Sequence, residues 1–342
     1  MYKPKYQITN QLLTNITKIN EIVLLLNNRR FPRLVLMELE DSARTLSTYA
    51  STSIEGNPLP LTEIKKVLKA QPRIARTSEQ EVLNYNQALN VLNQQLESGQ
   101  LELSKTLVLT VHKLVTKSLL PKFESGKFRQ KPVVVNDPKT RRVVFLPPDH
   151  QDVDSLMTDL IEFVKNNHQT INPLIVAGIF HKQMLIIHPF MDGNGRTTRL
   201  ATKMLLARMG LNTFNLFSFE NYYNQNVTKY FQMVGEFGDY NDLKLQIDFT
   251  DWLEYFTAGI IDELLRVQKM LLQNGNSPDT KLASHHLKIL KQIREHGFIT
   301  DRDYAQLTTR AKATRVIDFN QLIDLGMIKR LGKGKTTHYV LS

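Results

Sequence analysis

The stretch IIHPFMDGNGRTTRLATKMLLARMG, from Ile186 to Gly210, decides how this chain is interpreted. Residues Thr197 to Met209 have the apolar spacing of an amphipathic helix that ends at Gly210, and the sequence Asp-Gly-Asn-Gly at 192–195 precedes it. Glycines on both sides of an Asn allow successive backbone N–H groups to converge at a helix start, where unpaired donors and the positive dipole end favour anions. The stretch therefore predicts a phosphate-binding loop followed by a helix.

Four side chains with complementary chemistry accompany this loop. Arg196 and Arg199 lie three residues apart, so they share one face of the first helical turn, where guanidinium groups can grip phosphate oxygens. A neutral imidazole at His188 can accept a proton from a hydroxyl, and the Asp192 carboxylate can hold Mg²⁺. A tight turn with a core histidine and two solvated arginines is the plainer interpretation, but the concentration of all these groups favours phosphoryl or nucleotidyl transfer.

Composition excludes several other classes of protein. The chain has 342 residues, a formal net charge of +11 and no Cys, so iron–sulfur clusters, Cys-based zinc sites and disulfide scaffolds are excluded. At roughly 150 residues per domain, the length indicates two or three domains. The first twenty residues lack the apolar core of a signal peptide, and no apolar run approaches the roughly 20 residues of a membrane helix. We expect a soluble, cytoplasmic protein that makes no membrane contact.

The chain divides by charge and by pattern. Residues 281–342 hold 12 Lys and Arg against 5 Asp and Glu, which gives +7 of the total +11. The polar segment QNGNSPDT at 273–280 is the best candidate for a linker before this basic tail. Helical spacing dominates elsewhere, except that β-branched runs at Val133 to Val135 and Val143 to Phe145 flank a turn composition, Asn136 to Lys139, and predict one hairpin.

The sequence His-Pro-Phe-Met-Asp-Gly-Asn-Gly-Arg-Thr-Thr-Arg, residues 188–199, resembles the HPFx[D/E]GNGRxxR signature of the Fic family. The resemblance implies a mostly helical core that transfers AMP from ATP to a Ser, Thr or Tyr hydroxyl of a target protein. It implies that His188 deprotonates the hydroxyl, Asp192 holds Mg²⁺ and Arg199 holds the γ-phosphate. The implied nucleotide-binding positions of the motif are Gly193, Asn194, Gly195, Arg196, Thr197, Thr198 and Arg199.

Weaker landmarks agree with the same family. Gly126, Arg129 and Val133 to Val135 fit the pattern that begins the family's target-docking hairpin, so Val133, Val134 and Val135 are the expected flap, to which an extended target segment can add as a strand. His181 fits the lead-in to the motif, although a lone His on an apolar helix is more often structural. Residues that resemble the adenine surroundings are Asn226, Tyr230, Phe231 and Tyr240, but aromatic residues at helical spacing are more often core.

An inhibitory motif is also indicated. The segment LMELEDSARTLSTYASTSIE, residues 36–55, reads as a helix that Gly56 ends, which leaves Glu55 beside the negative end of the dipole, where it needs a cation. Ser51, Glu55 and Gly56 match the [S/T]xxxE[G/N] motif of the Fic family. The resemblance implies that Glu55 pairs with Arg199 and obstructs the γ-phosphate; an exposed, screened Glu is the alternative.

The basic tail reads as three helices and a β-wing. We expect helices at 282–295, 300–307 and 311–325, with a capping box at Thr300. The buried face of the third helix should contain Val316, Phe319, Leu322 and Ile323. Two strands should flank a basic turn at 332–335. The pattern resembles a winged helix–turn–helix; if it binds DNA, the expected contacts are Arg310, Lys312, Thr314, Arg315, Lys333 and Lys335. A protein-docking role is the alternative.

Together, these features predict a mainly α protein with a Fic-type helical core, a β-hairpin flap and a small C-terminal winged helix domain. The expected domains are an N-terminal helical region carrying the inhibitory motif (1–105), the catalytic core (106–272) and the winged helix domain (281–342). The expected activity is that of a protein adenylyltransferase, autoinhibited through Glu55, with ATP and Mg²⁺. Alternatives are transfer of UMP, phosphocholine or phosphate, removal of AMP, or a nucleotide-sensing DNA-binding regulator. Self-modification and a homodimer remain open.

Overall fold

Helices make up most of the chain in the computed structural model, which describes residues 2–28, 33–99, 102–137, 140–167, 169–211, 215–274 and 282–341. The chain divides into two compact units. The larger comprises Met1–Arg30 and Leu36–Asn276, and the smaller comprises Phe31–Val35 and Ser277–Ser342. The prediction of a mainly α protein is confirmed.

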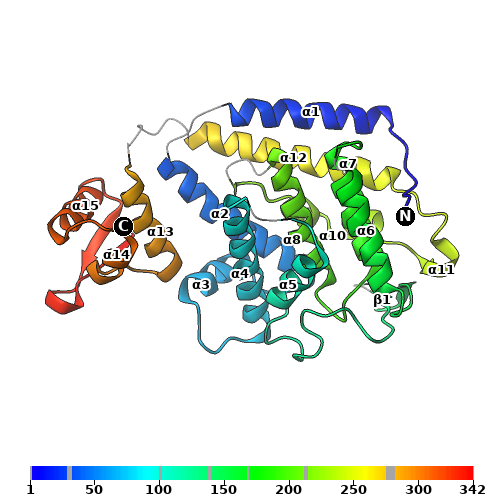
Figure 1. Ribbon diagram of the computed structural model, residues 1–342, viewed down its shortest axis with the longest axis horizontal. Helices are drawn as coiled ribbons and strands as arrows, with labels where there is room; N and C mark the ends of the chain where they lie inside the picture. Colours follow the sequence, from blue (N-terminus) through cyan, green and yellow to red (C-terminus); the bar gives the residue numbers. More distant parts are fainter. Residues whose placement is uncertain are drawn as a thin grey trace. The chain divides into compact units, whose positions relative to one another are not determined.

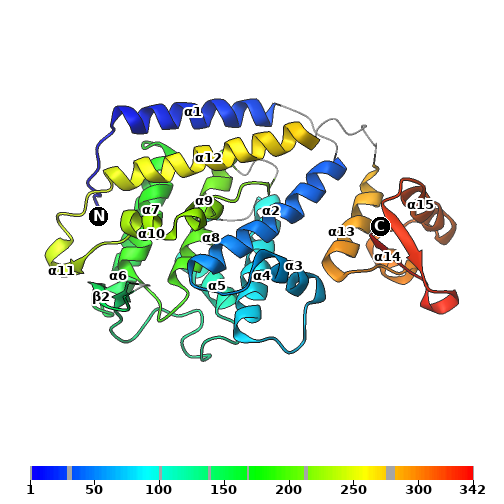
Figure 2. The ribbon, with the colours of Figure 1, turned by 180° about the vertical axis from the view of Figure 1, so that it is seen from behind.

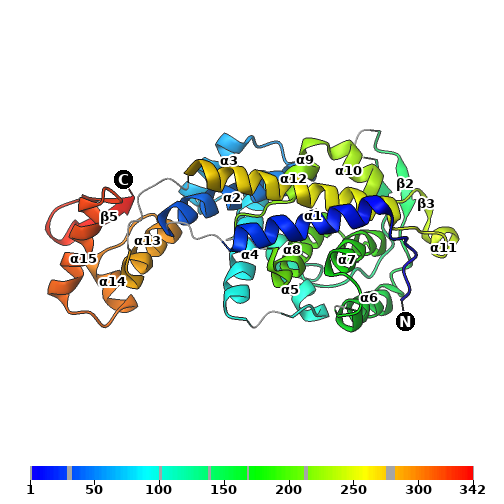
Figure 3. The same cartoon turned by 90° about the horizontal axis from the view of Figure 1, so that it is seen from above.

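The larger unit is a bundle of helices with one small sheet (Figure 1). Its α-helices are α1 (Asn10–Asn27), α2 (Arg33–Ile54), α3 (Leu61–Ala70), α4 (Thr77–Glu97), α5 (Lys105–Val115), α6 (Val153–Asn167), α7 (Pro173–Ile187), α8 (Asn194–Leu206), α9 (Glu220–Gln225), α10 (Val227–Val234), α11 (Tyr240–Leu243) and α12 (Thr250–Asn274). The long helices α1 and α12 lie side by side (Figure 3).

Helix α7 is the central helix of this unit. It is apolar on all sides, as expected for a helix buried all round, and it packs against α6, α8 and α12. A Cβ atom at Gly178 would lie 2.6 Å from Leu253 Cδ2, so only a glycine lets α12 approach this closely. The indole N–H of Trp252 donates to the Gly178 carbonyl at 2.8 Å. This packing fixes the C-terminal end of α7, where His188 follows.

The loop after α7 leads directly into α8, which begins earlier than expected. The predicted helix starts at Thr197, but α8 begins at Asn194 and is followed by a π-helical segment, Ala207–Leu211. Gly193 is the N-cap, with φ +78°, a conformation that favours glycine. Because the left-handed turn lies at Gly193, the backbone is already helical at Gly195 and Arg196.

The predicted hairpin is present but shorter, and it gains a third strand. Strands β1 (Val135–Asn136) and β2 (Val143–Leu146) pair antiparallel, and β3 (Gly238–Asp239) pairs parallel with β2. Val133 and Val134 lie outside the paired strand. Val135 is opposite Phe145, so continued pairing would place Val133 opposite Pro147, which has no N–H to donate. Within the predicted turn, residues 138 and 139 lie outside the described residues.

The smaller unit contains the expected order of elements (Figure 2): α13 (Ser284–His296), α14 (Asp301–Leu307), α15 (Lys312–Asp324), β4 (Ile328–Leu331) and β5 (His338–Leu341). Thr300 and Asp303 form the expected capping box at the start of α14. The predicted buried face of α15 is partly wrong: Phe319 and Leu322 are buried, but Val316 is 44% exposed. Asp318 takes a buried position on this helix instead, because Tyr304 and Arg310 satisfy its carboxylate.

The linker prediction falls largely on residues that the structure does not describe. Residues 275–280 lie outside the described ranges, and α12 extends to Asn274. Across the described part of the chain, every helix is either too short or too polar to cross a membrane.

Candidate active site

His188 stands at the end of α7 with its reactive nitrogen available. It caps the helix in a left-handed conformation (φ +49°), and its Nδ1 lies 3.2 Å from the carbonyl oxygen of Leu185. A carbonyl only accepts, so Nδ1 carries the proton and Nε2 keeps its lone pair. Burial lowers the pKa of His188, although the Leu185 carbonyl and the Glu55 carboxylate oppose this effect. The imidazole is therefore neutral at pH 7 and suited to accept a proton.

The loop between His188 and α8 is held in one conformation by its own side chains. The Asn194 amide donates to the Phe190 carbonyl and its oxygen accepts from the Phe190 N–H, both at 2.9 Å. Asp192 Oδ1 accepts from the Gly193 N–H at 2.6 Å, and its Oδ2 accepts from Arg196 at 3.1 Å. These bonds close the turn, so the N–H groups at the start of α8 are directed to one side.

His112 on α5, which the sequence pattern did not single out, packs against this loop and supports it. Its Nδ1 accepts from the Gly126 N–H at 2.9 Å, so its Nε2 carries the proton and donates to the Asp192 carbonyl at 2.9 Å. Its ring stacks on Phe190, with centroids 3.7 Å apart. Burial lowers the pKa of His112 to about 4, so the ring stays neutral. The available sequence signal was a histidine among the apolar residues Val108, Val111 and Val115, which have helical spacing.

Several buried donors around the start of α8 have no acceptor. Among the described residues, no hydrogen-bond partner exists for Nε of Arg196, Nη1 of Arg199, or the hydroxyls of Thr197 and Thr198. Arg196 Nη1 also makes no hydrogen bond, although the Glu81 carboxylate lies 3.4 Å from it. These side chains are 0–2% exposed. Leaving buried donors unpaired is costly, so such a cluster of them indicates a site that an anionic ligand completes.

Glu55 lies against this cluster. Its Oε1 is 2.7 Å from Arg199 Nη2, and the Arg199 guanidinium also donates to the hydroxyl and carbonyl of Ser51 at 2.7 and 2.9 Å. A Cβ atom at Gly195 would lie 2.1 Å from Glu55 Oε1, so the carboxylate occupies the space above the glycine loop. Burial lowers the pKa of Arg199, but the Glu55 carboxylate raises it, and the net direction is upward. Gly56, at φ +88°, ends the helix as expected.

A second buried network fixes α2 to α8. Glu220, which is fully buried, accepts from the Ser47 hydroxyl and the Tyr85 hydroxyl, both at 2.9 Å. Lys203 donates to Ser47 at 3.0 Å and lies 3.7 Å from Glu220. Sequence pattern alone does not indicate this network, because its members come from four separate segments.

Arg129 connects the hairpin to the end of α7. Its Nε donates to the His188 carbonyl at 2.9 Å, and its other guanidinium nitrogens donate to the carbonyls of Lys131 and Pro148. The side chain is 2% exposed. The hairpin and the loop that follows α7 are thus tied together by one buried cation, and exposed Val134 lies at the edge of the hairpin.

The segment that contains this site is similar in sequence to known proteins. Residues 102–206 match the profile of the Fic/DOC family. The chain contains a Fic domain. Over 166 residues it is 31% identical to the protein adenylyltransferase Fic of Drosophila erecta, a match covering 47% of this chain and 32% of that protein. The chain therefore spans about a third of that relative's length.

Solved structures show the same fold. A Fic family protein from Desulfovibrio desulfuricans superposes with a TM-score of 0.64 at 22% identity, covering 100% of this chain and 98% of the other. Fic-1 from C. elegans superposes with a TM-score of 0.60 at 21% identity, covering 77% of this chain and 73% of the other. The helical arrangement of the chain is thus that of Fic proteins.

Within the Fic domain, His181 is structural. Its Nδ1 lies 3.0 Å from the Thr202 hydroxyl, which itself donates to the Thr198 carbonyl, so Nδ1 carries the proton. Its Nε2 accepts from the Tyr230 hydroxyl at 3.0 Å. Trp252 and neighbouring rings surround it, and burial lowers its pKa well below the usual value.

The residues expected around adenine are not equally accessible. Tyr230 is fully buried and stacks on Tyr223, with centroids 4.5 Å apart, so contact with a base would require its ring to be uncovered. Tyr240 is 9% exposed and Phe231 is half-buried. Asn226 is exposed, but its oxygen accepts from the Lys229 N–H as the N-cap of α10. The adenine assignment stays a prediction.

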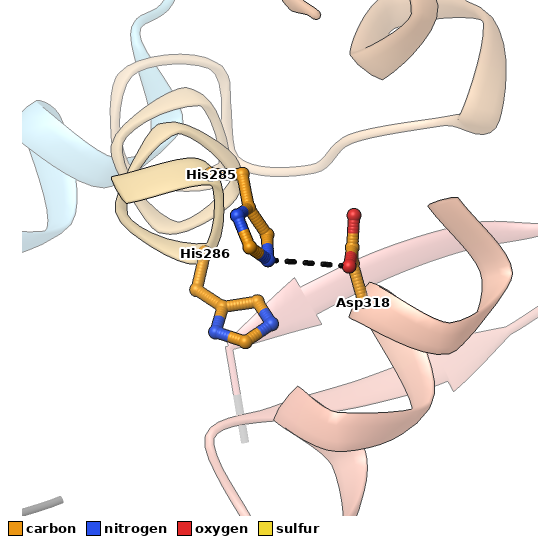
Figure 4. Close-up of side chains that lie close together, drawn as sticks. All are labelled: His285, His286 and Asp318. Atoms are coloured by element: carbon orange, nitrogen blue, oxygen red, sulfur yellow. Dashed lines mark ion pairs between the residues drawn. The ribbon is translucent and has the colours of Figure 1, made fainter. Parts of the chain in front are cut away.

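The smaller unit has its own polar cluster, formed by His285, His286 and Asp318 (Figure 4). These residues lie close enough to hold a metal ion. However, Tyr304 donates to Asp318 at 2.7 Å, Arg310 donates to it at 3.0 Å, and His285 lies 3.3 Å from it. Both oxygens of Asp318 already have partners and Arg310 supplies a positive charge, so a structural ion pair explains Asp318 and His285. Both ring nitrogens of His286 are buried without a hydrogen-bond partner among the described residues.

Proposed function

We propose that this protein is an adenylyltransferase that transfers AMP from ATP to a Ser, Thr or Tyr hydroxyl of a protein, with Glu55 as an internal inhibitor. One observation carries the proposal. Unpaired buried donors lie together at the start of α8, beside His188, whose Nε2 makes no hydrogen bond to the part of the chain that the structure describes. A triphosphate supplies the missing acceptors, and a hydroxyl beside it needs the free nitrogen as its base.

The reaction assigned to these residues is an in-line displacement. The target oxygen attacks the α-phosphorus of ATP, its proton passes to His188 Nε2, and the bond to the bridging oxygen breaks to release pyrophosphate. The backbone of residues 193–195 and the Arg196 guanidinium bind the phosphates, and Arg199 binds the γ-phosphate. These groups hold the α-phosphate still while charge develops on it.

Asp192 fits the proposed role of magnesium ligand. Its side chain is 57% exposed, so its oxygens can accept further ligands at the mouth of the loop. A single carboxylate together with substrate phosphates is a common way for proteins to bind Mg²⁺. The bound ion would neutralise phosphate charge.

Glu55 inhibits in this proposal by occupying the place of the γ-phosphate. Its carboxylate takes the Arg199 donor that the γ-phosphate requires and stands above Gly195. Two anions cannot share this space, so ATP binds without its γ-phosphate in position. The flap Val133, Val134 and Val135, in which Val134 is exposed, is proposed to receive an extended segment of the target.

Labelled ATP tests the proposal. Glu55→Gly should raise self-labelling or labelling of lysate proteins strongly, and His188→Ala in the same background should reduce it by roughly 10²- to 10⁴-fold. Intact-mass spectrometry distinguishes AMP from UMP and phosphate. Equal labelling by wild type, Glu55→Gly and the double variant would reject both the base and the inhibitor.

DNA binding by the smaller unit is a second proposal. Two of the expected contacts are already engaged: Arg315 donates to both oxygens of Asp301 at 2.8 and 2.9 Å, and Arg310 bonds Asp318. Lys312 and Lys333 remain exposed. Salt-dependent DNA binding that is lost on deletion of residues 281–342 would support this role, and its absence would favour protein docking.

A further inference from the structure

We infer that Asn57 and Glu81, outside the inhibitory motif, form a latch that holds Glu55 in the phosphate site. This inference rests on the proposed function, since it concerns the control of the same site. It assigns both residues a positioning role, because neither bonds the atoms that would react.

The first part of the latch pins the end of α2 to α4. The Asn57 N–H donates to the Thr52 carbonyl at 3.1 Å and the Gly56 N–H donates to the Ser53 carbonyl at 2.9 Å, a Schellman ending. The Asn57 amide then donates to the Ser78 carbonyl at 2.9 Å and to Glu81 Oε2 at 2.7 Å. Its side-chain oxygen accepts from the Leu59 N–H at 3.1 Å, so every polar atom of this side chain is used.

The second part connects the same helix α4 to the phosphate site. Glu81 Oε1 lies 3.4 Å from Arg196 Nη1, while the other oxygen of the same carboxylate holds Asn57. Arg196 is 2% exposed and also contacts Asp192. The Glu81 carboxylate thus bridges Asn57 and Arg196. Asn57 follows Glu55 by two positions, and Arg196 precedes Arg199 by three. The end of α2 and the start of α8 are joined twice, through Glu55 to Arg199 and through Asn57 and Glu81 to Arg196.

The structure also provides space for release. A pocket of about 440 Å³ is lined by Glu55, Gly56, Asn57 and Glu81, among others. The Glu55 side chain is 28% exposed, so it is not enclosed on that side. When the Asn57 bonds break, the helix end can shift and the carboxylate can withdraw from above Gly195. The free energy of a few hydrogen bonds is enough to shift an equilibrium between a closed and an open conformation of the site.

The latch is tested with Asn57→Ala and Glu81→Ala in the full chain, with Glu79→Gln as the matched control. Glu79 lies on the same turn of α4, but among the described residues its hydrogen bonds are all to Arg76 at the helix start. Loss of the Asn57 bonds should raise labelling by ATP about five- to thirtyfold, as expected for one or two hydrogen bonds. Glu81→Ala should act in the same direction, and Glu79→Gln should leave labelling within twofold of wild type.

A double variant separates positioning from general damage. In the Glu55→Gly background, Asn57→Ala should change labelling by less than twofold, because the residue acts through Glu55. An equal fall in both backgrounds would indicate a merely structural role and overturn the latch. Labelling that rises with Glu55→Gly but not with either latch variant would also overturn it.

Hydrogen–deuterium exchange provides a readout that does not depend on transfer. Asn57→Ala should speed exchange at the amides of residues 55–57 at least tenfold, whereas Glu79→Gln should not. If Glu55→Gly fails to label any protein, the proposed function fails, and exchange still decides the latch. Unchanged exchange in Asn57→Ala overturns the latch whatever the labelling shows.

Discussion

Two pairs of arginines in this protein meet carboxylates in contrasting ways. In the Fic domain, Arg196 and Arg199 are buried but retain donors with no acceptor among the described residues. In the smaller unit, Arg315 matches both oxygens of Asp301, and Arg310 bonds Asp318. A matched pair stabilises a fold without any ligand, whereas a buried arginine with spare donors is useful only when a ligand supplies acceptors. A group of unpaired donors on the consecutive residues 196–199, rather than positive charge, therefore indicates the candidate functional site.

The sharpest test of this contrast is Arg199→Ala in the Glu55→Gly background. Affinity for ATP with Mg²⁺ should fall by about 10- to 150-fold, as expected when charged hydrogen bonds are lost. Isothermal titration calorimetry measures this directly. Arg199→Lys, which keeps the charge but loses the planar fork, should fall less. Affinity that is unchanged in both variants would show that the spare donors do not bind phosphate.

The support that His112 gives to the loop before α8 can be tested through the pH dependence of stability. Its pKa is about 4 in the fold, below the usual 6.5, so the unfolded chain binds more protons between these values. This contribution to stability is complete above pH 6.5 and is lost as the pH falls towards 4. Between pH 7 and pH 5, His112 should account for about 2 kcal/mol of the loss.

The measurement is urea unfolding at the two pH values, followed by fluorescence of Trp252, the chain's one tryptophan, which is 1% exposed in the larger unit. His112→Gln should show a smaller loss of stability on acidification than wild type. The same loss in both proteins would place the pH-sensitive group elsewhere.

The pH profile of transfer reports on His188. Burial lowers the pKa of His188, and removal of the Glu55 carboxylate lowers it further, because that charge favours the protonated ring. In Glu55→Gly, the rate should therefore fall by less than twofold between pH 8 and pH 6.5, with its acidic midpoint below pH 6.5. Initial rates of labelling across this range measure the midpoint. A midpoint above pH 7 would contradict a neutral buried base.

The smallest effect is expected in the other arginine pair. Arg315→Gln removes a matched ion pair with partly exposed Asp301 and should change labelling and ATP affinity by less than twofold. A large loss of transfer in this variant would mean that the contrast between the two arginine pairs is wrong.

Local sequence patterns predicted much of the fold. The apolar spacing and the glycine stop signals placed the five helices that were predicted with bounds within a few residues, and the capping box at Thr300 is present. The predictions were wrong where contacts with residues elsewhere in the fold decide the burial of a side chain or the length of a strand. Val316 has the spacing of a core residue, yet Asp318 is buried because Tyr304 and Arg310 from elsewhere in the unit satisfy it. Likewise, strand β1 is cut short by Pro147 in the segment after its partner strand.

The sequence by itself determined which chemical groups the loop carries, because His188, Asp192 and the two arginines lie within twelve consecutive residues. The backbone conformation of such a short segment depends mainly on its own residues. Only the tertiary structure decided which groups remain free. Glu55 reaches Arg199 across 144 positions, and Asn57 reaches Glu81 across 24. His112 supports Asp192 from 80 positions away. Helix packing decides which of these distant residues become hydrogen-bond partners. The order of residues along the chain therefore does not show which donors are bonded and which remain unbonded.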